Sequence, residues 1–387
     1  MQNKSIKIAL FFTYGMSFKD WYLAGYYIRD SLLYNKLCEI GHEVYFVTYG
    51  DKTDSEYLPK DSKIKLLTRP ARMSKRLYAY LIPFIHRKVL KGIDLIKSHQ
   101  LNGARYAVLA KSVYRKPYVA RCGYLISVFA AHEGITGYKK VKIDMEERLA
   151  FSAADAACVP WEGEIDYVTT RYGLRREKFY ACPNWVDTEQ FKPDKSVKKQ
   201  PGRICFIGRL HPQKQPMLLL EAIKNLDNIE LLMIGKGHLK SQIEEKCKEY
   251  KINATLIDYA SNESLPGYLN SSSIYILPTR YEGGSPKTLL EAMACGLPVV
   301  STDAFGVDEA FEHMIHGFKC KVDDVNAMAD AIKTLLTNHE LRQQLGNNSR
   351  SHVLETYSIE KALERELVIY DQLLKAKQVQ RQGNGKS

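Results

Sequence analysis

The sequence predicts an α/β protein made of two Rossmann-like, doubly wound parallel-sheet domains that face each other across an inter-domain cleft. Three observations favour this fold. The chain has 387 residues, which is too long for one hydrophobic core and typical of two domains. Short apolar runs alternate with helical patterns, as in successive βαβ units. The alternation stops at a basic, proline-bearing segment (191–203) and then begins again, so this segment separates two sheets.

The first domain is expected to span residues 1–185. Its first apolar run, IKIALFF (6–12), suits a buried parallel strand that ends in a turn, and a helical pattern follows over about 20–39. The later strand-like runs of this domain are VYFVTY (44–49), IKLL (64–67), DLIKS (94–98), PYVAR (117–121) and AACVP (156–160).

The second domain is expected over residues 203–357, after a linker at 186–202. Its strand-like runs are ICFIG (204–208), IELLMIG (229–235), ATLID (254–258), SIYILPT (273–279) and PVVST (298–302). A last helix over 358–378 is expected to pack back on the first domain, and the tail QRQGNGKS (380–387) is expected to be disordered. Open parallel sheets bind ligands at the carboxyl ends of their strands, so two facing sheets would direct both sets of loops into one cleft.

Composition limits the classes of partner. The formal net charge of +12 favours nucleotides, sugar phosphates, nucleic acid or an anionic membrane surface, although a solvated basic surface is the simpler explanation. The eight cysteines are scattered without a CxxC pair, which argues against zinc and disulfides and for a reducing compartment. The N-terminal apolar run is too short for a signal peptide, and no run approaches the roughly 18 apolar residues that span a bilayer. We therefore expect a cytoplasmic protein that is soluble or lies on a membrane.

The most informative stretch is YEGGSPKTLLEAMACGLPVVST (281–302), in which a short helix directly follows a strand. Ser285 is a candidate N-cap and Pro286 suits the first helical position. We therefore expect a helix over 286–295 whose N-terminus lies at the carboxyl edge of the second sheet.

The start of this helix is a candidate anion site. Backbone amides in the first turn have no partner within an α-helix, and the helix dipole favours negative charge beside them. The amides concerned belong to Lys287, Thr288 and Leu289. Two preceding glycines, Gly283 and Gly284, allow a ligand to approach the backbone closely.

Two glutamates flank the predicted anion site. Glu291 shares a helix face with Lys287 and Thr288, where its carboxylate is better suited to ribose hydroxyls than to a phosphate. Glu282 precedes the turn and could hold hydroxyls on the other side. Hydrogen-bond acceptors on both sides of an anion site suit a nucleotide-sugar, in which a diphosphate lies between a ribose and a sugar. The alternative is a capped helix whose glutamates face solvent.

A second loop of the same domain supports this interpretation. In FIGRLHPQK (206–214), Gly208 ends a strand, and Arg209 and Lys214 follow within one loop. Two cations at the end of a strand can neutralise a diphosphate, and arginine can bind it in a bidentate manner. The alternative is a solvated basic loop.

These stretches resemble the retaining group 1 glycosyltransferases, which have the GT-B fold. Four motifs occur in the family's order and cover most of the second domain and the linker. They are PNWVDTEQFKP (183–193), GRLHPQK (208–214), MIGKGHLKSQIEE (233–245) and LPTRYEGGSPKTLLEAMACGLPVVST (277–302). The first domain resembles the family more weakly, through IALFFTYG and EIGHEVYFVT.

The resemblance implies catalytic roles for three residues of the second domain. Arg209 and Lys214 would grip the donor diphosphate, and Glu282 or its neighbours would bind the donor sugar. Glu291 would bind the ribose, while the amides at 287–289 would meet the phosphates.

The resemblance also implies donor contacts at the edges of the site. Gly15, in the loop after the first strand, would close over the diphosphate from the first domain, which binds the acceptor. Tyr259, in the segment DYAS (258–261), would face the nucleotide base. The turn residues Gly283, Gly284 and Ser285 would lie against the donor.

The sequence departs from the family pattern at two places. Eight residues separate Glu282 from Glu291, one more than the family's usual separation, so Gly283 occupies the strict position. The family often carries a histidine after the strand equivalent to PYVAR, but RCGYLIS stands here. The candidates for that part of the cleft are His99, Arg121, Tyr124 and His132, although a single histidine is more often structural.

The chemistry implied by the resemblance needs no metal and no cofactor. Charge builds on the departing diphosphate, and fixed cations and amides can stabilise it. The pair Asp323 and Asp324 opens a helix, so we interpret it as N-terminal charge and a cap rather than as metal ligands. Stereochemical retention follows from the resemblance alone; the leaving phosphate oxygen could accept the acceptor's proton.

The segment 63–91 suggests where an acceptor is found. It carries nine lysines and arginines and no acidic residue, interleaved with aromatic and aliphatic side chains. This pattern suits an anionic membrane surface that delivers a polyprenyl-linked acceptor. The alternative is a core-facing amphipathic helix with a solvated basic face. Nucleic acid is not expected, because no binding module is recognised.

The leading hypothesis is a hexosyltransferase that moves a sugar from a nucleotide-diphosphate sugar, such as a UDP-sugar, to a saccharide or lipid-linked saccharide. The expected setting is bacterial cell-surface polysaccharide or lipopolysaccharide biosynthesis at the cytoplasmic membrane face. One alternative is a nucleotide-sugar epimerase of the same architecture. Another is a non-catalytic nucleotide-sugar-binding protein.

Overall fold

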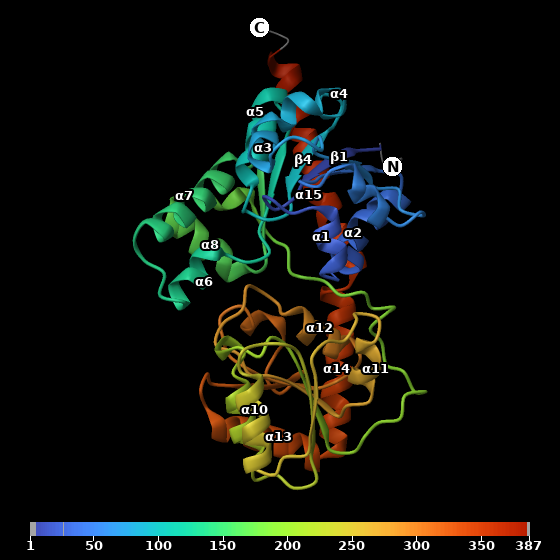
Figure 1. Ribbon diagram of the computed structural model, residues 1–387, viewed down its shortest axis with the longest axis vertical. Coiled ribbons are helices and arrows are strands. Elements are labelled where there is room, and N and C mark those ends of the chain that lie inside the picture. The colour runs from blue at the N-terminus through green and yellow to red at the C-terminus, as the bar shows by residue number, and fades with distance from the viewer. Residues whose placement is uncertain (1–4, 26, 385–387) are drawn as a thin grey trace. The chain divides into compact units, whose positions relative to one another are not determined.

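The computed structural model describes residues 5–25 and 27–384, which divide into two compact units (Figure 1). The first unit comprises the chain up to Cys182 together with the chain from Ala362 onward, and the second comprises Pro183–Lys361. Residues 186–202, expected as a linker, lie within the second unit, where Val186 and Phe191 join a buried apolar cluster. Each unit is an α/β sandwich around one parallel sheet.

The first unit is built on a seven-stranded parallel sheet with the order β3-β2-β1-β4-β5-β6-β7. The strands are β1 (Lys7–Phe11), β2 (Glu43–Val47), β3 (Lys65–Leu67), β4 (Leu95–Ser98), β5 (Tyr118–Arg121), β6 (Ala156–Val159) and β7 (Phe179–Ala181). Six of them have a counterpart among the predicted apolar runs. The seventh, β7, was not predicted, because three residues of edge strand carry too little apolar pattern.

Nine α-helices contribute to the first unit within its described residues. They are α1 (Phe18–Leu23), α2 (Tyr27–Glu39), α3 (Lys75–Ile85), α4 (Arg87–Leu90), α5 (Ala104–Tyr114), α6 (Ile126–His132), α7 (Gly137–Ala153), α8 (Glu162–Tyr172) and, from Ala362 onward, α15 (Ile359–Asn384). The single helical pattern expected over 20–39 is two helices, α1 and α2. Ser17 begins α1 with a reciprocal capping box to Asp20.

The last helix, α15, is longer than the sequence predicts. It continues to Asn384, so the prediction of disorder from residue 380 is wrong for residues 380–384. Ile369 and Tyr370 of α15 are buried in the core beside the strands of the first sheet. The buried Lys97 of β4 forms an ion pair with Glu366 of α15, which fixes the helix against the sheet.

The second unit has a six-stranded parallel sheet with the order β10-β9-β8-β11-β12-β13. The strands are β8 (Arg203–Ile207), β9 (Glu230–Ile234), β10 (Ala254–Ile257), β11 (Ile274–Leu277), β12 (Val299–Thr302) and β13 (Gly317–Cys320). The helices are α9 (Pro216–Ile223), α10 (Lys240–Glu249), α11 (Leu265–Asn270), α12 (Lys287–Ala294), α13 (Val325–Thr337) and α14 (His339–Thr356). The strand β13 was not predicted.

Helices cover both faces of the second sheet. Alternate residues of β8 show this arrangement: Ile204 and Phe206 belong to one buried cluster, and Cys205 and Ile207 belong to the other. Burial on both faces explains why the strands read as continuous apolar runs rather than as alternating ones.

Among the described residues, no helix combines the length and apolarity that crossing a membrane requires. All eight cysteines are free thiols.

Candidate functional site

Each sheet contains one point at which the strand order reverses, and most of the predicted site residues flank these two points. In the second sheet the reversal lies between β8 and β11. Open α/β sheets bind ligands at such a switch point, beyond the carboxyl ends of the strands. The loop after β8 carries Gly208, Arg209 and Lys214, and the loop after β11 carries Glu282.

Lys214 and Glu282 form an ion pair across this switch point, and their side chains are only 12% and 10% exposed. Lys214 ends a short 3-10 helix, Pro212–Lys214, and Glu282 lies in the turn before α12. From the sequence, both residues were predicted to contact the same ligand. The structure adds that they bind each other, so the turn before α12 is held to the loop after β8.

Gln213 organises the same loop and was not predicted. Its buried side chain donates from Nε2 to the carbonyl oxygen of Tyr281 at 2.8 Å, and its Oε1 accepts from Nη2 of Arg209 at 2.6 Å. Its carbonyl oxygen accepts the backbone N–H of Arg280 at 2.9 Å. Gln213 therefore fixes the Arg209 guanidinium relative to the turn that carries Glu282. The sequence could have indicated this residue, because it lies within the motif GRLHPQK.

The turn before α12 requires glycine at two places. Gly284 has φ +114°, a conformation that other residues rarely adopt. Gly306, in the loop after β12, has φ +80°, and a Cβ there would lie 2.4 Å from the carbonyl oxygen of Glu282. The backbone N–H of Glu282 donates to the carbonyl of Phe305 at 2.7 Å, so the two loops lie directly against each other.

The N-terminus of α12 differs in detail from the prediction. Pro286, rather than Ser285, is the N-cap, and no side chain caps the helix, so the assignment of Ser285 as the cap is wrong. The carbonyl of Ser285 instead accepts Nδ2 of Asn184 at 3.0 Å. The amide of Leu289 donates to the carbonyl of Pro286 at 3.1 Å, so it is not an open donor. The amides of Lys287 and Thr288 remain in the first helical turn, which offers no carbonyl four residues earlier.

The side chains of α12 divide between the core and the loop edge. Leu289 is fully buried in the apolar core, so its side chain is not available to a ligand. Thr288 accepts a hydrogen bond from the buried Tyr275 hydroxyl at 2.7 Å. Nζ of Lys287 lies 4.4 Å from the ring centroid of Trp185.

Both glutamates of this segment are buried, which contradicts the alternative of solvent-facing glutamates. A carboxylate is costly to remove from water without polar partners. Glu282 has Lys214 as its partner. Glu291 projects from the middle of α12, one turn after Lys287.

Tyr259 follows β10, the edge strand of the second sheet, and its side chain is 65% exposed. Nζ of Lys236, in the loop after β9, lies 5.9 Å from its ring centroid. Lys236 and Tyr259 therefore lie next to each other, in the loops after β9 and β10.

In the first sheet the strand order reverses between β1 and β4. Gly15 follows β1, and its carbonyl accepts Nζ of Lys75 at 2.6 Å. His99 follows β4 and is buried against Trp21, with ring centroids 4.6 Å apart. Of the predicted residues in this unit, these two flank the switch point.

Arg121 ends β5 and lies next to His99, since its Nη1 donates to the His99 carbonyl at 3.5 Å. Tyr124 is partly exposed and its ring packs on Phe129, with centroids 5.2 Å apart. His132 ends α6 and is exposed. The structure thus brings His99 and Arg121 together.

The acidic pair at residues 323 and 324 stabilises local structure. Asp324 is the N-cap of α13 and accepts the Ala327 amide at 2.9 Å, as predicted. Asp323 accepts Nη2 of Arg280 at 2.9 Å and bonds to Gln215. Across residues 5–25 and 27–384, no group of three or more histidine, cysteine or acidic side chains is placed to hold a metal ion.

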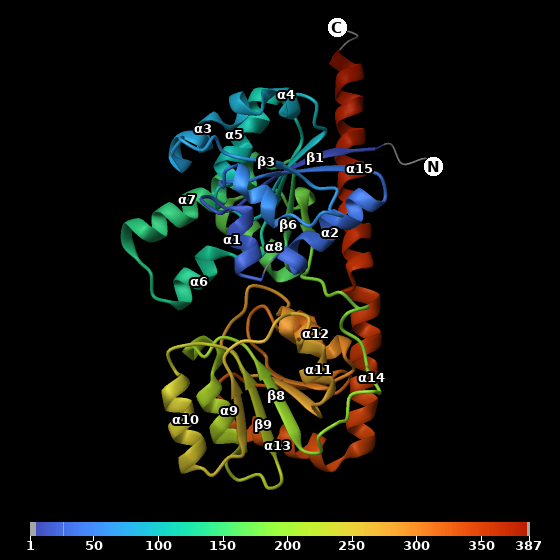
Figure 2. The ribbon, with the colours of Figure 1, turned by 45° about the vertical axis from the view of Figure 1, so that its right-hand side comes forward.

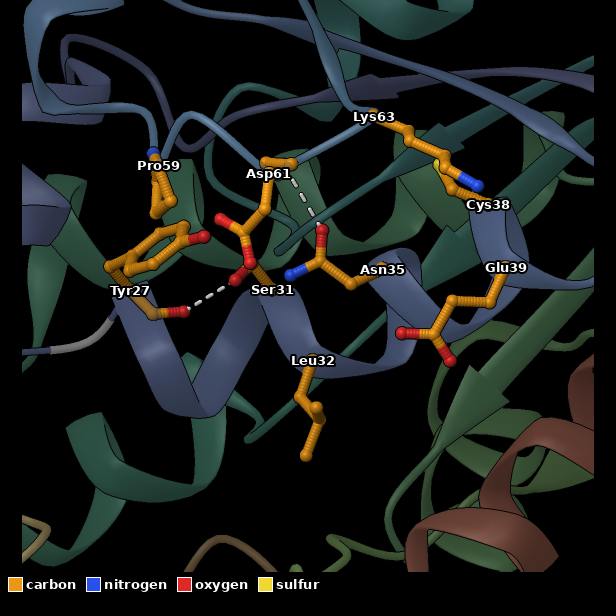
Figure 3. Close-up of a pocket in the computed structure, with 10 residues that line it drawn as sticks. Tyr27, Ser31, Leu32, Asn35, Cys38, Glu39, Pro59, Asp61 and Lys63 are labelled. Carbon is orange, nitrogen blue, oxygen red and sulfur yellow. Dashed lines mark hydrogen bonds between the residues drawn. The ribbon is translucent and has the colours of Figure 1, made fainter.

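A cavity of about 320 Å³ lies in the first unit between α2 and the loop that precedes β3 (Figure 3). Its wall contains Tyr27, Asn35 and Asp61, and Oδ1 of Asn35 accepts the Ser62 hydroxyl at 3.1 Å. None of the predicted site residues lines it.

Comparisons with known proteins agree with the motifs. Residues 187–352 match the family described as glycosyl transferases group 1, and residues 32–190 match glycosyltransferase family 4. An uncharacterized glycosyltransferase of Haemophilus influenzae is 31% identical over 340 residues, which cover 85% of this chain and 91% of that protein. The UDP-Gal:alpha-D-GlcNAc-diphosphoundecaprenol alpha-1,3-galactosyltransferase of Escherichia coli is 23% identical over 205 residues, 49% of this chain and 52% of that protein.

A solved structure supports the fold. Anabaena HepE in complex with UDP has a TM-score of 0.74 at 14% identity, covering 95% of this chain and 100% of that one. The predicted architecture of two Rossmann-like parallel-sheet domains is therefore confirmed as the GT-B fold. The matches leave the epimerase alternative without support.

Proposed function

The chain belongs to the group 1 glycosyltransferases, and from this premise we propose that it transfers a sugar from a nucleotide-diphosphate sugar to a saccharide or lipid-linked saccharide. The observation that carries the proposal is the convergence of two cations and a helix N-terminus at one switch point. Arg209 and Lys214 follow β8, and the start of α12 follows β11. Positive charge and the backbone amides of a first helical turn at one point suit a diphosphate.

Lys214 is proposed to bind the donor diphosphate while it remains in contact with Glu282. An ammonium group has several N–H donors, so one can bond the carboxylate while the others bond phosphate oxygens. The ion pair then holds Lys214 in position before the donor arrives. Glu282 is left with acceptor capacity for a sugar hydroxyl.

The remaining donor contacts are assigned by their places around the second sheet. Glu291 accepts from the ribose hydroxyls, and the amides at the start of α12 bond the phosphates. Tyr259 offers its exposed ring to the base. The proposal of uridine rests on the UDP bound to HepE and on the UDP-galactose named for the E. coli relative. The role of Gly15 on the diphosphate remains a prediction.

In the proposed reaction the bond between the anomeric carbon and the phosphate oxygen breaks, and the acceptor hydroxyl oxygen forms the new bond. The electron pair leaves with the nucleoside diphosphate, where Arg209, Lys214 and the α12 amides stabilise it. The acceptor's proton passes to a phosphate oxygen, on the same face of the sugar. We propose that the reaction retains the configuration of the anomeric carbon, transfers a hexosyl group and requires no metal.

The acceptor is proposed to be a saccharide or a polyprenyl-linked saccharide used in bacterial surface polysaccharide or lipopolysaccharide assembly. Support comes from the E. coli relative, whose name gives a diphosphoundecaprenol-linked acceptor. The basic segment 63–91 is proposed to meet an anionic lipid surface, and the enzyme is proposed to act at the cytoplasmic face of the membrane.

Incubation of the protein with a panel of nucleotide-sugars tests the proposal. We expect slow release of nucleoside diphosphate and free sugar from one donor, with faster release when a suitable acceptor is added. Isomerisation of the donor would replace the transferase with an epimerase. Binding without any turnover would leave a non-catalytic nucleotide-sugar-binding protein.

A further inference from the structure

The helix α7 (Gly137–Ala153) carries an apolar stripe that faces away from the rest of the first unit. Tyr138, Val141, Met145 and Leu149 are 82%, 54%, 67% and 45% exposed. Residues spaced by three and four positions lie on one face of a helix. The opposite face contains Glu147, Ala150 and Phe151, which are buried.

Charges on α7 are sorted between its two faces. Its acidic residues bond within the protein: Asp144 to Arg171 at 2.8 Å, Glu146 to Arg105, and Glu147 to the Tyr172 hydroxyl at 2.8 Å. Its basic residues point outward beside the stripe, and those on its margins are Lys139, Lys142 and Arg148, all exposed. The outward face of α7 is therefore apolar in the middle and positive at the edges.

A second helix of the same layer repeats this pattern. In α3 (Lys75–Ile85), Leu77, Tyr80 and Phe84 are 52%, 49% and 60% exposed, while Tyr78 and Ile82 are buried. Basic residues precede and follow this stripe in a segment without acidic residues. The helix thus uses one face for the core and leaves a second apolar face outside, as the membrane interpretation of segment 63–91 expects.

The two stripes belong to one helical layer. Both α3 and α7 pack against α5 (Ala104–Tyr114), and the three helices lie on the side of the first sheet opposite to α15 (Figure 2). We define the outer face of this layer, with the α3 and α7 stripes, as the α3–α7 face. Aromatic and aliphatic side chains edged by lysine and arginine are typical of helices that lie in a membrane interface.

We propose that the α3–α7 face docks on an anionic phospholipid membrane, with the α7 stripe inserted among the acyl chains and the flanking cations on the headgroups. A second copy of the chain fits this face less well. A two-fold contact would place each cationic margin against an identical cationic margin. Lipid phosphates supply the charge opposite to these cationic margins, and the net charge of +12 favours the same attraction.

Co-sedimentation with vesicles tests the α7 stripe directly. The probes are vesicles of phosphatidylcholine alone and of phosphatidylcholine mixed with phosphatidylglycerol, each at low and high salt. The test variant is Val141→Ser with Met145→Ser, and the matched control is Val368→Ser, an equally exposed apolar residue of α15 (55%). We expect binding to the anionic vesicles only, weakened by salt and weakened roughly tenfold or more by the double variant, with the control unchanged.

The charged margin has its own test. Lys139→Gln with Lys142→Gln should weaken binding and reduce its salt dependence, because fewer cations meet the headgroups. Absence of binding to anionic vesicles, or binding that neither double variant changes, would overturn the proposal. A concentration-dependent dimer that Met145→Ser dissociates would also overturn it, since the stripe would then bind a second copy.

The proposal can fail independently of the transferase assignment. Neither stripe contains a residue assigned to the donor, so hydrolysis of a nucleotide-sugar in the absence of vesicles should be the same in the stripe variants and in the unaltered protein. Loss of vesicle binding with intact hydrolysis supports membrane docking. Loss of hydrolysis in the stripe variants would contradict it, because the face would then serve the active fold rather than a membrane.

Discussion

The Lys214–Glu282 ion pair links the two loops on which the donor assignment rests. Each side chain is about nine-tenths buried, so each charge has lost most of its water and relies on the other. A diphosphate brings further negative charge to Lys214 and supplies the electrostatic stabilisation that water no longer provides. We propose that the pair is a preformed cation site whose geometry is set before the donor arrives.

Replacement of Lys214 by alanine should lower turnover by about tenfold or more, because one fixed cation at the leaving diphosphate is removed. Glu282 would remain buried without this partner, so a modest loss of stability is also expected. Turnover and urea unfolding should be measured together, with Lys224→Ala on the exposed surface of α9 as the control. Full activity in Lys214→Ala would place the donor elsewhere.

Replacement of Glu291 by alanine should also lower turnover by about tenfold or more, because the ribose hydroxyls lose their acceptor. Glu291→Gln keeps one acceptor oxygen and should recover part of the loss. The KM for the nucleotide-sugar should rise more than the KM for the acceptor. Equal changes in both constants would argue against a ribose contact and for a structural role of this buried side chain.

The sequence predicted which residues gather at the second switch point, since motif position and strand order are local properties. It did not predict that Lys214 and Glu282 bind each other, or that Gln213 holds Arg209. The Lys214–Glu282 pair joins loops 68 positions apart, and the sequence pattern does not report on such distances, whereas Gln213 and Arg209 lie four positions apart within one loop. Ser285 was assigned as the cap from its residue type, but the turn directs its carbonyl to Asn184 instead.

At the scale of elements, α12 and the loop after β12 form one unit through Gly306. Gly306→Ala would place a Cβ 2.4 Å from the carbonyl oxygen of Glu282, at a φ of +80°. We expect a loss of stability of about 1–3 kcal/mol and weaker donor binding, because the turn that carries Glu282 must move.

Gly267→Ala in α11 is the matched control for this substitution, since a Cβ there meets no atom within 4 Å. Alanine in a helix should leave stability unchanged or raise it slightly. Urea unfolding and nucleotide titration of both variants check the prediction. Equal behaviour of the two variants would show that the loop after β12 does not support the turn.

The sequence predicted elements well where burial gives a long apolar run. The short strands β7 and β13 were missed, because three or four residues at a sheet edge give little pattern. The helical pattern at 20–39 was predicted as one helix although α1 ends at Leu23. The tail was predicted as disordered from its polar composition, but α15 continues to Asn384 because helix formers precede the glycines.

At the scale of the whole molecule, the buried pair of Lys97 and Glu366 joins side chains 269 positions apart. Burial disfavours both charges, but their mutual attraction outweighs it, so the pKa of Glu366 is lowered and the pKa of Lys97 is raised. Glu366→Gln leaves the Lys97 charge buried without its partner and should cost about 3–5 kcal/mol. Lys97→Met combined with Glu366→Leu should be close to neutral.

The same pair predicts a pH dependence of stability. Glu366 contributes stability above its ordinary pKa of 4.5, and this is lost as pH falls through the lowered folded pKa. Lys97 contributes below its ordinary pKa of 10.5, and this is lost as pH rises through the raised folded pKa. The free energy of unfolding of the Lys97→Met, Glu366→Leu variant should therefore fall less than that of the unaltered protein at both extremes. Parallel pH profiles would contradict this role.

Two doubly wound domains could be predicted because the alternation of strands and helices occurs twice in the chain. The ion pair between α15 and the first sheet could not be predicted, since the partner of a buried lysine in β4 lies near the other end of the sequence. Segment 63–91, which contains α3, was predicted to meet a membrane, but the α7 half of the α3–α7 face was not predicted. The acidic residues of α7 interrupt its basic and apolar pattern in the sequence, but in the structure they bond inward and leave the stripe exposed.

The central claim is that Arg209, Lys214 and the start of α12 bind the diphosphate of a nucleotide donor. The most direct measurement is calorimetric titration of UDP and UMP against the unaltered protein and against Arg209→Ala with Lys214→Ala. We predict that the unaltered protein prefers UDP and that the double variant loses this preference, roughly tenfold or more for each charge-assisted bond removed. An unchanged ratio of UDP to UMP affinity in the double variant would contradict the account.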